Sequence, residues 1–212
     1  EKWGGKFLRA PDIFFTILEK GKGKLVRLGD IADVRRGFTT GANEFFCLSE
    51  ETVKHWKIEK DFLRPFVKSP RDLSSIVIQE GALKQWLFYC HKSRHELRSS
   101  NAIRYIEWGE ASERDESGRE IRCFHKRATC KGRGDWWNLG ERNPAVVNCN
   151  YLVNEVMRFN YGHCFVSDNF QEIHPHKNVD PKILWLVANS SLFQFFVNMV
   201  GRSNFGGGLL KI

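Results

Sequence analysis

Apolar residues recur at helical spacing in three parts of the chain. From Pro11 onward they stand three or four positions apart until Gly21, which is typical of a helix with proline in its first turn and glycine after its end. The same criterion predicts helices over residues 11–20, 96–111 and 181–200. Ser49 followed by two acidic residues is a further helix-start signal.

Short apolar runs bounded by turn residues predict strands between these helices. The predicted strand regions are 25–34 (two strands around a tight turn), 45–48, 74–79, 86–90, 122–130 and 145–153, with a hairpin over 162–173. Many short strands combined with a few helices favour an α+β fold, in which mixed, strongly twisted sheets pack against the helices. We find no internal repeat and no low-complexity tract.

The stretch VRRGFTTGANEFF is predicted to form a loop between two apolar segments. It has no His, no Cys and a single acid, so it is poorly equipped for catalysis. Its side chains suit DNA instead, because a guanidinium can bind guanine, an Asn can bind adenine, and Thr can reach a phosphate or a thymine methyl. The candidates for base contact in the major groove are Arg35, Arg36, Thr39, Thr40 and Asn43. A connecting loop held by arginine ion pairs explains the same residues.

A second basic stretch, residues 119–133, carries six cationic side chains and one acid, Glu120, and is closely followed by Trp136 and Trp137. Cations beside flat aromatic rings are typical of surfaces that bind a phosphate backbone and its bases. A solvated strand edge protected by charges accounts for the pattern equally well. Together with the polar tail, this stretch supplies the remaining DNA-contact candidates: Lys126, Arg127, Lys131, Arg133, Trp136, Arg202 and Asn204.

The overall charge agrees with such a partner. The chain has 212 residues, 42% of them hydrophobic, and a formal net charge of +8, which favours a polyanionic partner but does not specify a fold. Residues 183–200 are the most apolar segment, but five polar side chains interrupt them, so we expect a buried helix and no membrane span. The N-terminus does not resemble a signal peptide, which predicts an intracellular (cytoplasmic) protein.

Motifs for catalysis are absent from the sequence. There is no phosphate-binding GxxxxGK[ST] loop and no GxSxG elbow. The only acid-x-Lys triplet, Asp180-Pro181-Lys182, has a proline that spoils nuclease geometry. The six cysteines form no CxxC pair, and Cys123, His125 and Cys130 are the single weak candidate for a metal cluster. No metal site and no catalytic residue is therefore predicted in this chain.

Several segments, taken in order, resemble a known family. KLVRLGDIADVRRGFTTGANEFFCL is similar to the start of a target-recognition domain, the part of restriction-modification proteins that reads DNA sequence. DFLRPF, YIEWGE, HKR followed by WWNL, ANSSLF and GGGLLKI resemble later family segments in the expected order. The resemblance is to the C-terminal specificity region of N6-adenine DNA methyltransferases, including those of type II restriction-modification systems.

This resemblance implies a fold, a partner and a missing cofactor. The fold would be that of a target-recognition domain, with residues 1–23 as a helix and hinge from a preceding catalytic domain and residues 24–212 as the DNA-recognition domain of a larger protein. The partner would be double-stranded DNA, with a possible endonuclease partner or fused nuclease. S-adenosylmethionine would bind the missing catalytic domain, and no cofactor would bind this fragment. Asn143-Pro144-Ala145-Val146 lacks the second proline and the aromatic residue of the family's catalytic motif.

Two other functions remain open on the sequence alone. The aromatic residues are also suited to docking a partner chain, as in the specificity subunit of a multi-subunit restriction-modification complex. A hidden nuclease, as in fused restriction-modification enzymes, is the third alternative, and the absence of a suitable acid-x-Lys site argues against it.

Overall fold

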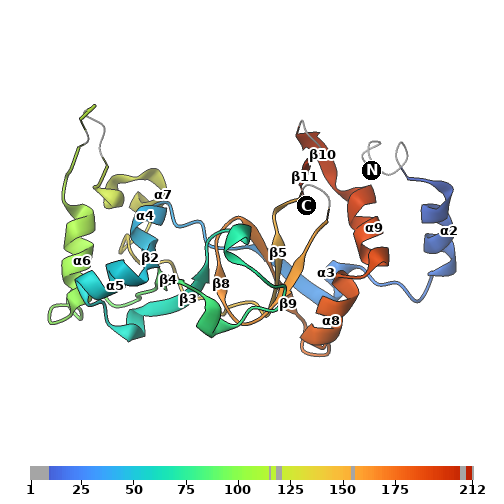
Figure 1. Cartoon of the computed structure of the whole chain (residues 1–212), viewed down its shortest axis with the longest axis horizontal. Coiled ribbons are helices and arrows are strands. Elements are labelled where there is room, and N and C mark those ends of the chain that lie inside the picture. The colour runs from blue at the N-terminus through green and yellow to red at the C-terminus, as the bar shows by residue number, and fades with distance from the viewer. Residues whose placement is uncertain (1–9, 115, 118–120, 154–155, 206–208, 212) are drawn as a thin grey trace.

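Three small β-sheets organise the described part of the chain, and two of them form the centres of two lobes that lie side by side (Figure 1). The computed structural model describes residues 10–114, 116–117, 121–153, 156–205 and 209–211. The mixture of short strands and helices confirms the predicted α+β class.

The first lobe is built on a sheet in the order β2-β4-β3-β8, in which only the β3–β8 pair is parallel. Helices pack around this sheet and contribute side chains to its core (Figure 1). The elements of this lobe are α4 (Asn43–Phe46), β2 (Cys47–Ser49), α5 (Glu50–Trp56), β3 (Leu63–Val67), β4 (Gln85–Phe88), α6 (Asn101–Glu110), α7 (Ala128–Lys131) and β8 (Phe165–Val166).

The second lobe is built on an antiparallel sheet in the order β1-β9-β5-β7. Helices α8 and α9 cover one face of it, and α2 lies at the outer end of the molecule (Figure 1). The elements are α2 (Asp12–Lys20), α3 (Leu28–Ile31), β1 (Ala32–Arg36), β5 (Val147–Asn150), β7 (Phe159–Tyr161), β9 (Phe170–Pro175), α8 (Pro181–Ala188) and α9 (Ser191–Val200).

The remaining elements are short. A third sheet joins three strands near the end of the chain in the order β10-β11-β6. The strands and single 3₁₀ turns are β6 (Leu152–Val153), β10 (Arg202–Phe205), β11 (Leu209–Lys211), η1 (Lys60–Phe62), η2 (Pro70–Asp72), η3 (Glu80–Ala82) and η4 (Phe124–Lys126).

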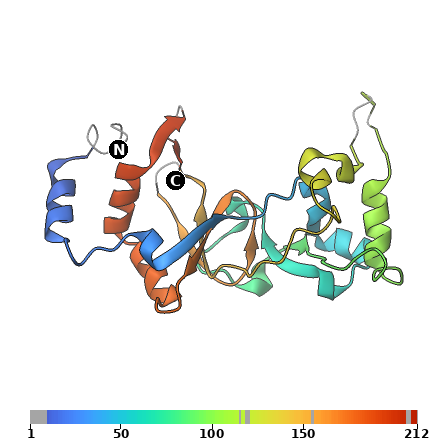
Figure 2. The ribbon, with the colours of Figure 1, turned by 180° about the vertical axis from the view of Figure 1, so that it is seen from behind.

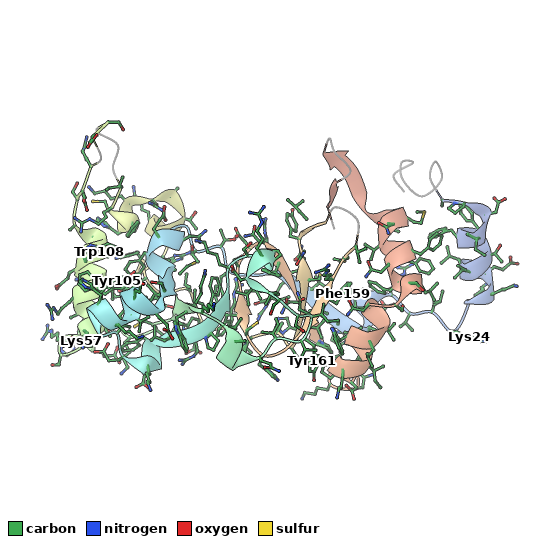
Figure 3. All side chains as sticks on the ribbon, viewed as in Figure 1. Lys24, Lys57, Tyr105, Trp108, Phe159 and Tyr161 are labelled. Carbon is green, nitrogen blue, oxygen red and sulfur yellow. The ribbon has the colours of Figure 1, made fainter. Side chains whose placement is uncertain are left out.

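Each lobe has its own aromatic core. In the first lobe Phe45 stacks on Tyr105 with ring centroids 4.6 Å apart, and Tyr105 stacks in turn on Trp108 at 5.3 Å. In the second lobe Phe159 packs edge-on against Phe193 at 5.3 Å. Figure 3 shows Tyr105 and Trp108 in one lobe and Phe159 in the other. Such pairs add to the stability that burial of the rings provides.

The lobes are joined by backbone pairing as well as by loops. Strand β1 runs along the second lobe and continues directly into the first lobe, as Figure 2 shows. Strand β8 pairs with β3 in the first lobe, while the next strand, β9, is central in the second. The Phe38 amide donates to the Val166 carbonyl at 2.8 Å, so the chain leaving β1 is attached to β8. Backbone hydrogen bonds therefore connect the two lobes at their junction.

The predicted helix over 181–200 is wrong in one respect, because it is broken into α8 and α9, which lie 69° apart. Asn189 causes the break. Its side-chain amide donates to the Phe159 carbonyl at 3.0 Å, and its Oδ1 accepts from the Phe159 amide at 3.2 Å. Ser190 then caps α9 by accepting from the Phe193 amide. In the part of the chain that the structure describes, no single helix is long and apolar enough to cross a membrane, and only this bent pair passes such a test by length and composition.

Other helix predictions are confirmed and several strand predictions are not. The helices over 11–20 and 96–111 correspond to α2 and α6, and Ser49 caps α5 as expected. The hairpin over 162–173 is wrong because β8 and β9 pair with other strands. Residues 28–31 form helix α3 where a tight turn between two strands was expected. Residues 74–79 contribute only one isolated bridge, from Val77 to Tyr161.

Candidate nucleic-acid interface

The loop between β1 and α4, residues 37–42, is positioned by close backbone contact with the junction. Phe38 is 2% exposed, and its carbonyl accepts from the Asp168 amide at 3.1 Å. A Cβ atom at Gly37 would lie 2.2 Å from the Ser167 carbonyl oxygen, so this approach requires glycine. Main-chain contacts thus hold the start of the loop against the junction.

The polar side chains of this loop and of Asn43, the first residue of α4, divide into exposed and buried groups. Thr39 and Asn43 are exposed, and the Thr39 hydroxyl donates to the Asp168 carboxylate at 3.4 Å. Thr40 is 1% exposed, donates to Asn43 Oδ1 at 2.5 Å and accepts from the Ala42 amide at 3.2 Å. The prediction of a DNA contact for Thr40 is therefore wrong in this conformation, because its hydroxyl is consumed inside the turn.

The basic stretch does not form the predicted strand over 122–130. Cys123 adopts a left-handed backbone conformation with φ 68°, which interrupts any extended strand, and the chain continues into η4 and α7. Figure 1 shows α7 beside α4, so the basic stretch lies against the loop of residues 37–42. Arg119, which the pattern also included, lies outside the described residues.

Arg127 connects α7 to α4 by an ion pair. Its Nη1 lies 2.8 Å from Glu44 Oε2, and its guanidinium lies 4.7 Å from the centre of the Phe124 ring. The hydrogen bond from Arg127 holds the pKa of the Glu44 carboxyl below its ordinary value. Glu44 is thus ionised and offsets the Arg127 charge, which leaves Arg127 less available to a phosphate than the sequence suggested.

The other cations of this stretch differ in their surroundings. Lys126 and Lys131 are exposed on the surface of the first lobe. Arg133 is half-buried and donates to the Thr39 carbonyl at 3.0 Å and to the Trp136 carbonyl at 3.3 Å. Arg133 therefore ties the basic stretch to the loop that carries Thr39.

Trp136 lies in the core of the first lobe. It is 6% exposed, its ring centroid is 4.5 Å from that of Phe45, and its indole N–H donates to Glu110 at 2.9 Å. A base cannot stack on a ring that is covered in this way, so the prediction of a DNA contact for Trp136 is corrected. Burial of the large apolar area of a tryptophan side chain stabilises the core, which explains why Trp136 packs inside the lobe and not on its surface.

Arg35 pairs with a buried carboxylate. Its Nε lies 2.7 Å from Glu172 Oε2, and the Glu172 side chain is fully buried. Arg35 also donates to the Asn143 carbonyl at 2.7 Å. A carboxylate without solvent needs a charged or hydrogen-bonded partner, which gives Arg35 a structural role. The segment at Asn143, which only partly resembled a catalytic motif, thus orients an arginine.

The tertiary structure gathers four arginines around one hollow of about 420 Å³, which we call the arginine hollow. It lies where β1, the loop of residues 37–42 and the segment after α7 meet. Its lining consists of Arg35, Arg36, Gly37, Phe38, Thr39, Arg133, Leu139 and Arg142. Arg142 is the residue that the sequence did not indicate, because it stands alone in its segment and belongs to no basic run.

A second hollow, of about 810 Å³, lies between residues 69–76 and strands β5 and β7. Arg71 and Arg158 also line it, and both are exposed. It is larger than the arginine hollow but holds half as many arginines.

The tail residues predicted to contact DNA cannot be placed. The backbone of Arg202 and Asn204 belongs to β10, but their side chains lie outside the described residues. The predictions for these two residues therefore stay predictions.

Metal and thiol chemistry find no support in the described ranges. No group of three or more metal-ligating side chains occurs there, and this includes the region of Cys123, His125 and Cys130. Burial raises the pKa of Cys47 to about 11 and that of Cys149 to about 12, so both thiols are protonated at neutral pH. Cys47 and Cys149 therefore behave as small apolar residues.

Comparison with known proteins assigns the class. Residues 1–212 match the family of the C-terminal domain of the type II methyltransferase M.Eco57I, and the chain therefore belongs to this family of restriction-modification methyltransferase domains. The type II methyltransferase M.AccI of Acinetobacter calcoaceticus is 26% identical over 228 residues, which are 99% of this chain and 37% of that protein. The chain thus spans little more than a third of its curated relative.

Solved structures agree at the level of the fold. The type IIG restriction endonuclease BpuSI superposes on 95% of this chain and 24% of its own length, with a TM-score of 0.60 and 14% sequence identity. At this identity the likeness concerns the fold alone. It supports the α+β architecture that was expected from a target-recognition domain.

Proposed function

We propose that this chain is the double-stranded DNA recognition domain of a type II restriction-modification methyltransferase. The observation that carries the proposal is the convergence of the loop of residues 37–42, helix α7 and the arginine hollow at one junction. Side chains that bind phosphates and base edges are gathered there, although they come from distant parts of the sequence.

The chemistry of the whole protein is proposed from the family. The parent would transfer a methyl group from S-adenosylmethionine to the N6 atom of adenine, and the cofactor would bind outside this chain. This domain would hold the duplex while the catalytic part extrudes the target base. A nuclease, attached or separate, would act on the same DNA site. Detection of N6-methyladenine by mass spectrometry of digested DNA would test the methylated atom.

The residues divide into two proposed roles. Exposed Thr39, in the loop of residues 37–42, and Asn43, at the start of α4, would reach base edges, because backbone contacts hold the segment that carries them. Lys126 and Lys131 on the first lobe would contact phosphates, with a smaller contribution from Arg127 because Glu44 offsets its charge.

Salt-dependent DNA binding tests the proposal. We expect the protein to bind a pool of random-sequence 24-base-pair duplexes with an affinity that falls steeply as KCl rises, measured by fluorescence anisotropy. Replacement of Arg127 and Lys131 together by Gln should make the slope of log Kobs against log[KCl] shallower by about 1 to 2, since each lost phosphate contact removes about 0.9. The matched control, Lys182→Gln, changes an exposed lysine on α8 in the other lobe and should leave the slope unchanged.

The result that contradicts the proposal is equally definite. If the wild-type protein shows no salt-dependent binding to duplex DNA, the domain does not recognise DNA. An unchanged slope in the double variant would instead remove α7 from the interface and leave DNA recognition standing.

A protein-interaction role is the second candidate, and one observation favours it. Apolar side chains are exposed on α8, where Ile183 is 60%, Leu186 58% and Val187 53% accessible. Contiguous apolar surface of this kind is typical of contact with another protein surface. Gel filtration with and without duplex DNA separates the candidates, because a pure interaction scaffold would elute in the same position in both runs.

A further inference from the structure

We propose that the arginine hollow binds one phosphate group of the DNA backbone and does not read a base. The inference rests on the proposed function and deepens it, because it assigns the chemical class of ligand to a specific site. It also reassigns Arg36, for which the sequence predicted a base contact, and adds Arg142, for which it predicted nothing.

The arginines are held in place by backbone carbonyl groups. Arg36 Nε donates to the Asp168 carbonyl at 2.9 Å, Arg133 Nη2 to the Thr39 carbonyl at 3.0 Å, and Arg142 Nη1 to the Arg36 carbonyl at 3.3 Å. Each guanidinium has five N–H donors, so these bonds fix its position while leaving other donors for a ligand. The site is therefore ordered before any ligand arrives.

The guanidinium groups of two of these arginines lie over aromatic rings. The Arg36 guanidinium carbon lies 4.2 Å from the centre of the Tyr151 ring, and that of Arg142 lies 4.7 Å from the centre of the Phe38 ring. Stacking of this kind holds the plane of a guanidinium without neutralising its charge. The hydrogen-bonding edges stay available to an acceptor.

Most of the positive charge in the hollow has no ionic partner. Within the part of the chain that the structure describes, Arg35 has a carboxylate within ion-pair distance, namely Glu172, whereas Arg36, Arg133 and Arg142 have none. The Asp168 carboxylate accepts from the Thr39 hydroxyl but does not line the hollow. Three of the four arginines that line the hollow therefore have no carboxylate within ion-pair distance among the described residues.

The positive charge of the arginine hollow favours an anionic ligand. Like charges that converge repel one another, and an anion placed between them removes the repulsion and gains charge-assisted hydrogen bonds. A base edge is neutral and offers only partial charges, so it offsets the repulsion between converging cations less than an anion does. A phosphodiester carries a full negative charge and fits well within about 420 Å³. A contact of this type is independent of sequence and would set the register in which Thr39 and Asn43 meet the groove.

Single and double substitutions test the assignment in the purified protein. Arg142→Gln and Arg36→Gln should each lower the affinity for random 24-base-pair duplexes about tenfold and make the salt slope shallower by about 0.9. Because both arginines serve the same phosphate, the double variant should lose no more slope than one phosphate contact accounts for. Arg104→Gln is the matched control, because Arg104 is exposed on α6, away from the hollow, and should bind like the wild type.

Sequence dependence decides between phosphate and base. The affinity of the wild type is first measured for a set of duplexes of different sequence, which gives a ranking. If the hollow binds a phosphate, Arg142→Gln should weaken binding to every duplex in this set by the same factor. A changed ranking would mean that the hollow reads a base and would overturn the proposal. Arg36→Gln repeats the test at an exposed position, and circular dichroism verifies that both variants are folded.

The remaining outcomes separate this inference from the proposed function. If both hollow variants bind as the wild type does while the Arg127 and Lys131 double variant flattens the slope, the hollow lies outside the interface and DNA recognition stands. Loss of DNA binding from the wild type itself would refute both. Stabilisation of the wild type by inorganic phosphate at constant ionic strength, with no effect of the variants on DNA binding, would make the hollow a small-anion site and overturn the assignment.

Discussion

At the scale of the residue, the contact that most distinguishes this sheet is the buried ion pair between Arg35 and Glu172. The register of β1 on β9 places these residues opposite each other, and Asn148 on β5 lies opposite Glu172 on the other side. Asn160 donates to Asn148 at 3.1 Å, so polar side chains form a row across one face of the sheet. Such a row is costly unless its members are paired, and the Glu172 carboxylate has Arg35 Nε at 2.7 Å and His174 Nε2 at 3.5 Å from its Oε2 atom.

We expect Arg35→Gln to lower the free energy of unfolding by about 2 kcal/mol, because it leaves the fully buried Glu172 carboxylate without its charged partner. Urea denaturation at neutral pH measures the loss. Glu50→Gln is the control: Glu50 forms an exposed ion pair with Lys54, and its loss should cost less than about 0.5 kcal/mol. Equal effects of the two substitutions would contradict the structural role of Arg35.

At the scale of the element, one polar residue decides the course of the last two helices. The run from Pro181 to Val200 has the composition of one buried helix, yet Asn189 directs its side chain to both backbone groups of Phe159. The Trp185 indole N–H donates to the same carbonyl at 2.7 Å. These bonds satisfy the polar groups of β7 and fix the bend that lets α8 and α9 cover one face of the sheet.

Asn189→Ala should destabilise the protein by about 1.5 to 3 kcal/mol, since it leaves the Phe159 amide without its partner beneath two helices. The thermal unfolding midpoint, followed by circular dichroism, should fall accordingly. Asn198→Ala provides the comparison within α9, because no side-chain hydrogen bond of Asn198 is found among the described residues and alanine favours a helix. A larger loss for Asn198→Ala than for Asn189→Ala would show that the bend does not depend on this contact.

At the scale of the whole molecule, the junction between the lobes determines which surfaces meet. Phe165 on β8 packs against Phe38 at 5.5 Å and against Tyr89 at 4.9 Å between ring centroids. Phe66 on β3 is its partner in the parallel strand pair. The loop of residues 37–42 and the arginine hollow depend on this packing, because Phe38 belongs to both.

Phe165→Ala is expected to cost about 3 to 5 kcal/mol, since it opens a cavity at the junction of the lobes. Tryptophan fluorescence in urea, which reports mainly on the first lobe, should show the loss together with circular dichroism, which reports on both. Val156→Ala removes an exposed side chain and should change stability by less than about 0.5 kcal/mol. Loss confined to one of the two signals would mean that the lobes unfold independently.

The sequence by itself determined the class of the fold and most of its helices. Local signals such as Pro11 with Gly21, or Ser49 as a cap, act over a few residues and can be read without the rest of the chain. It also pointed to the loop of residues 37–42 and to the basic stretch, because runs of hydrogen-bond donors and of cationic residues can be recognised in the sequence alone. The order of the family-like segments along the chain indicated the class of protein.

Only the tertiary structure decided which of these residues can meet a ligand. Trp136 and Arg133 are close in sequence, yet one is buried in the core and the other lines the arginine hollow. Arg142 joined the hollow from a segment without any basic pattern. The reason is that burial and charge convergence depend on contacts between residues about a hundred positions apart, as between Arg36 and Arg142, and no local pattern encodes such contacts.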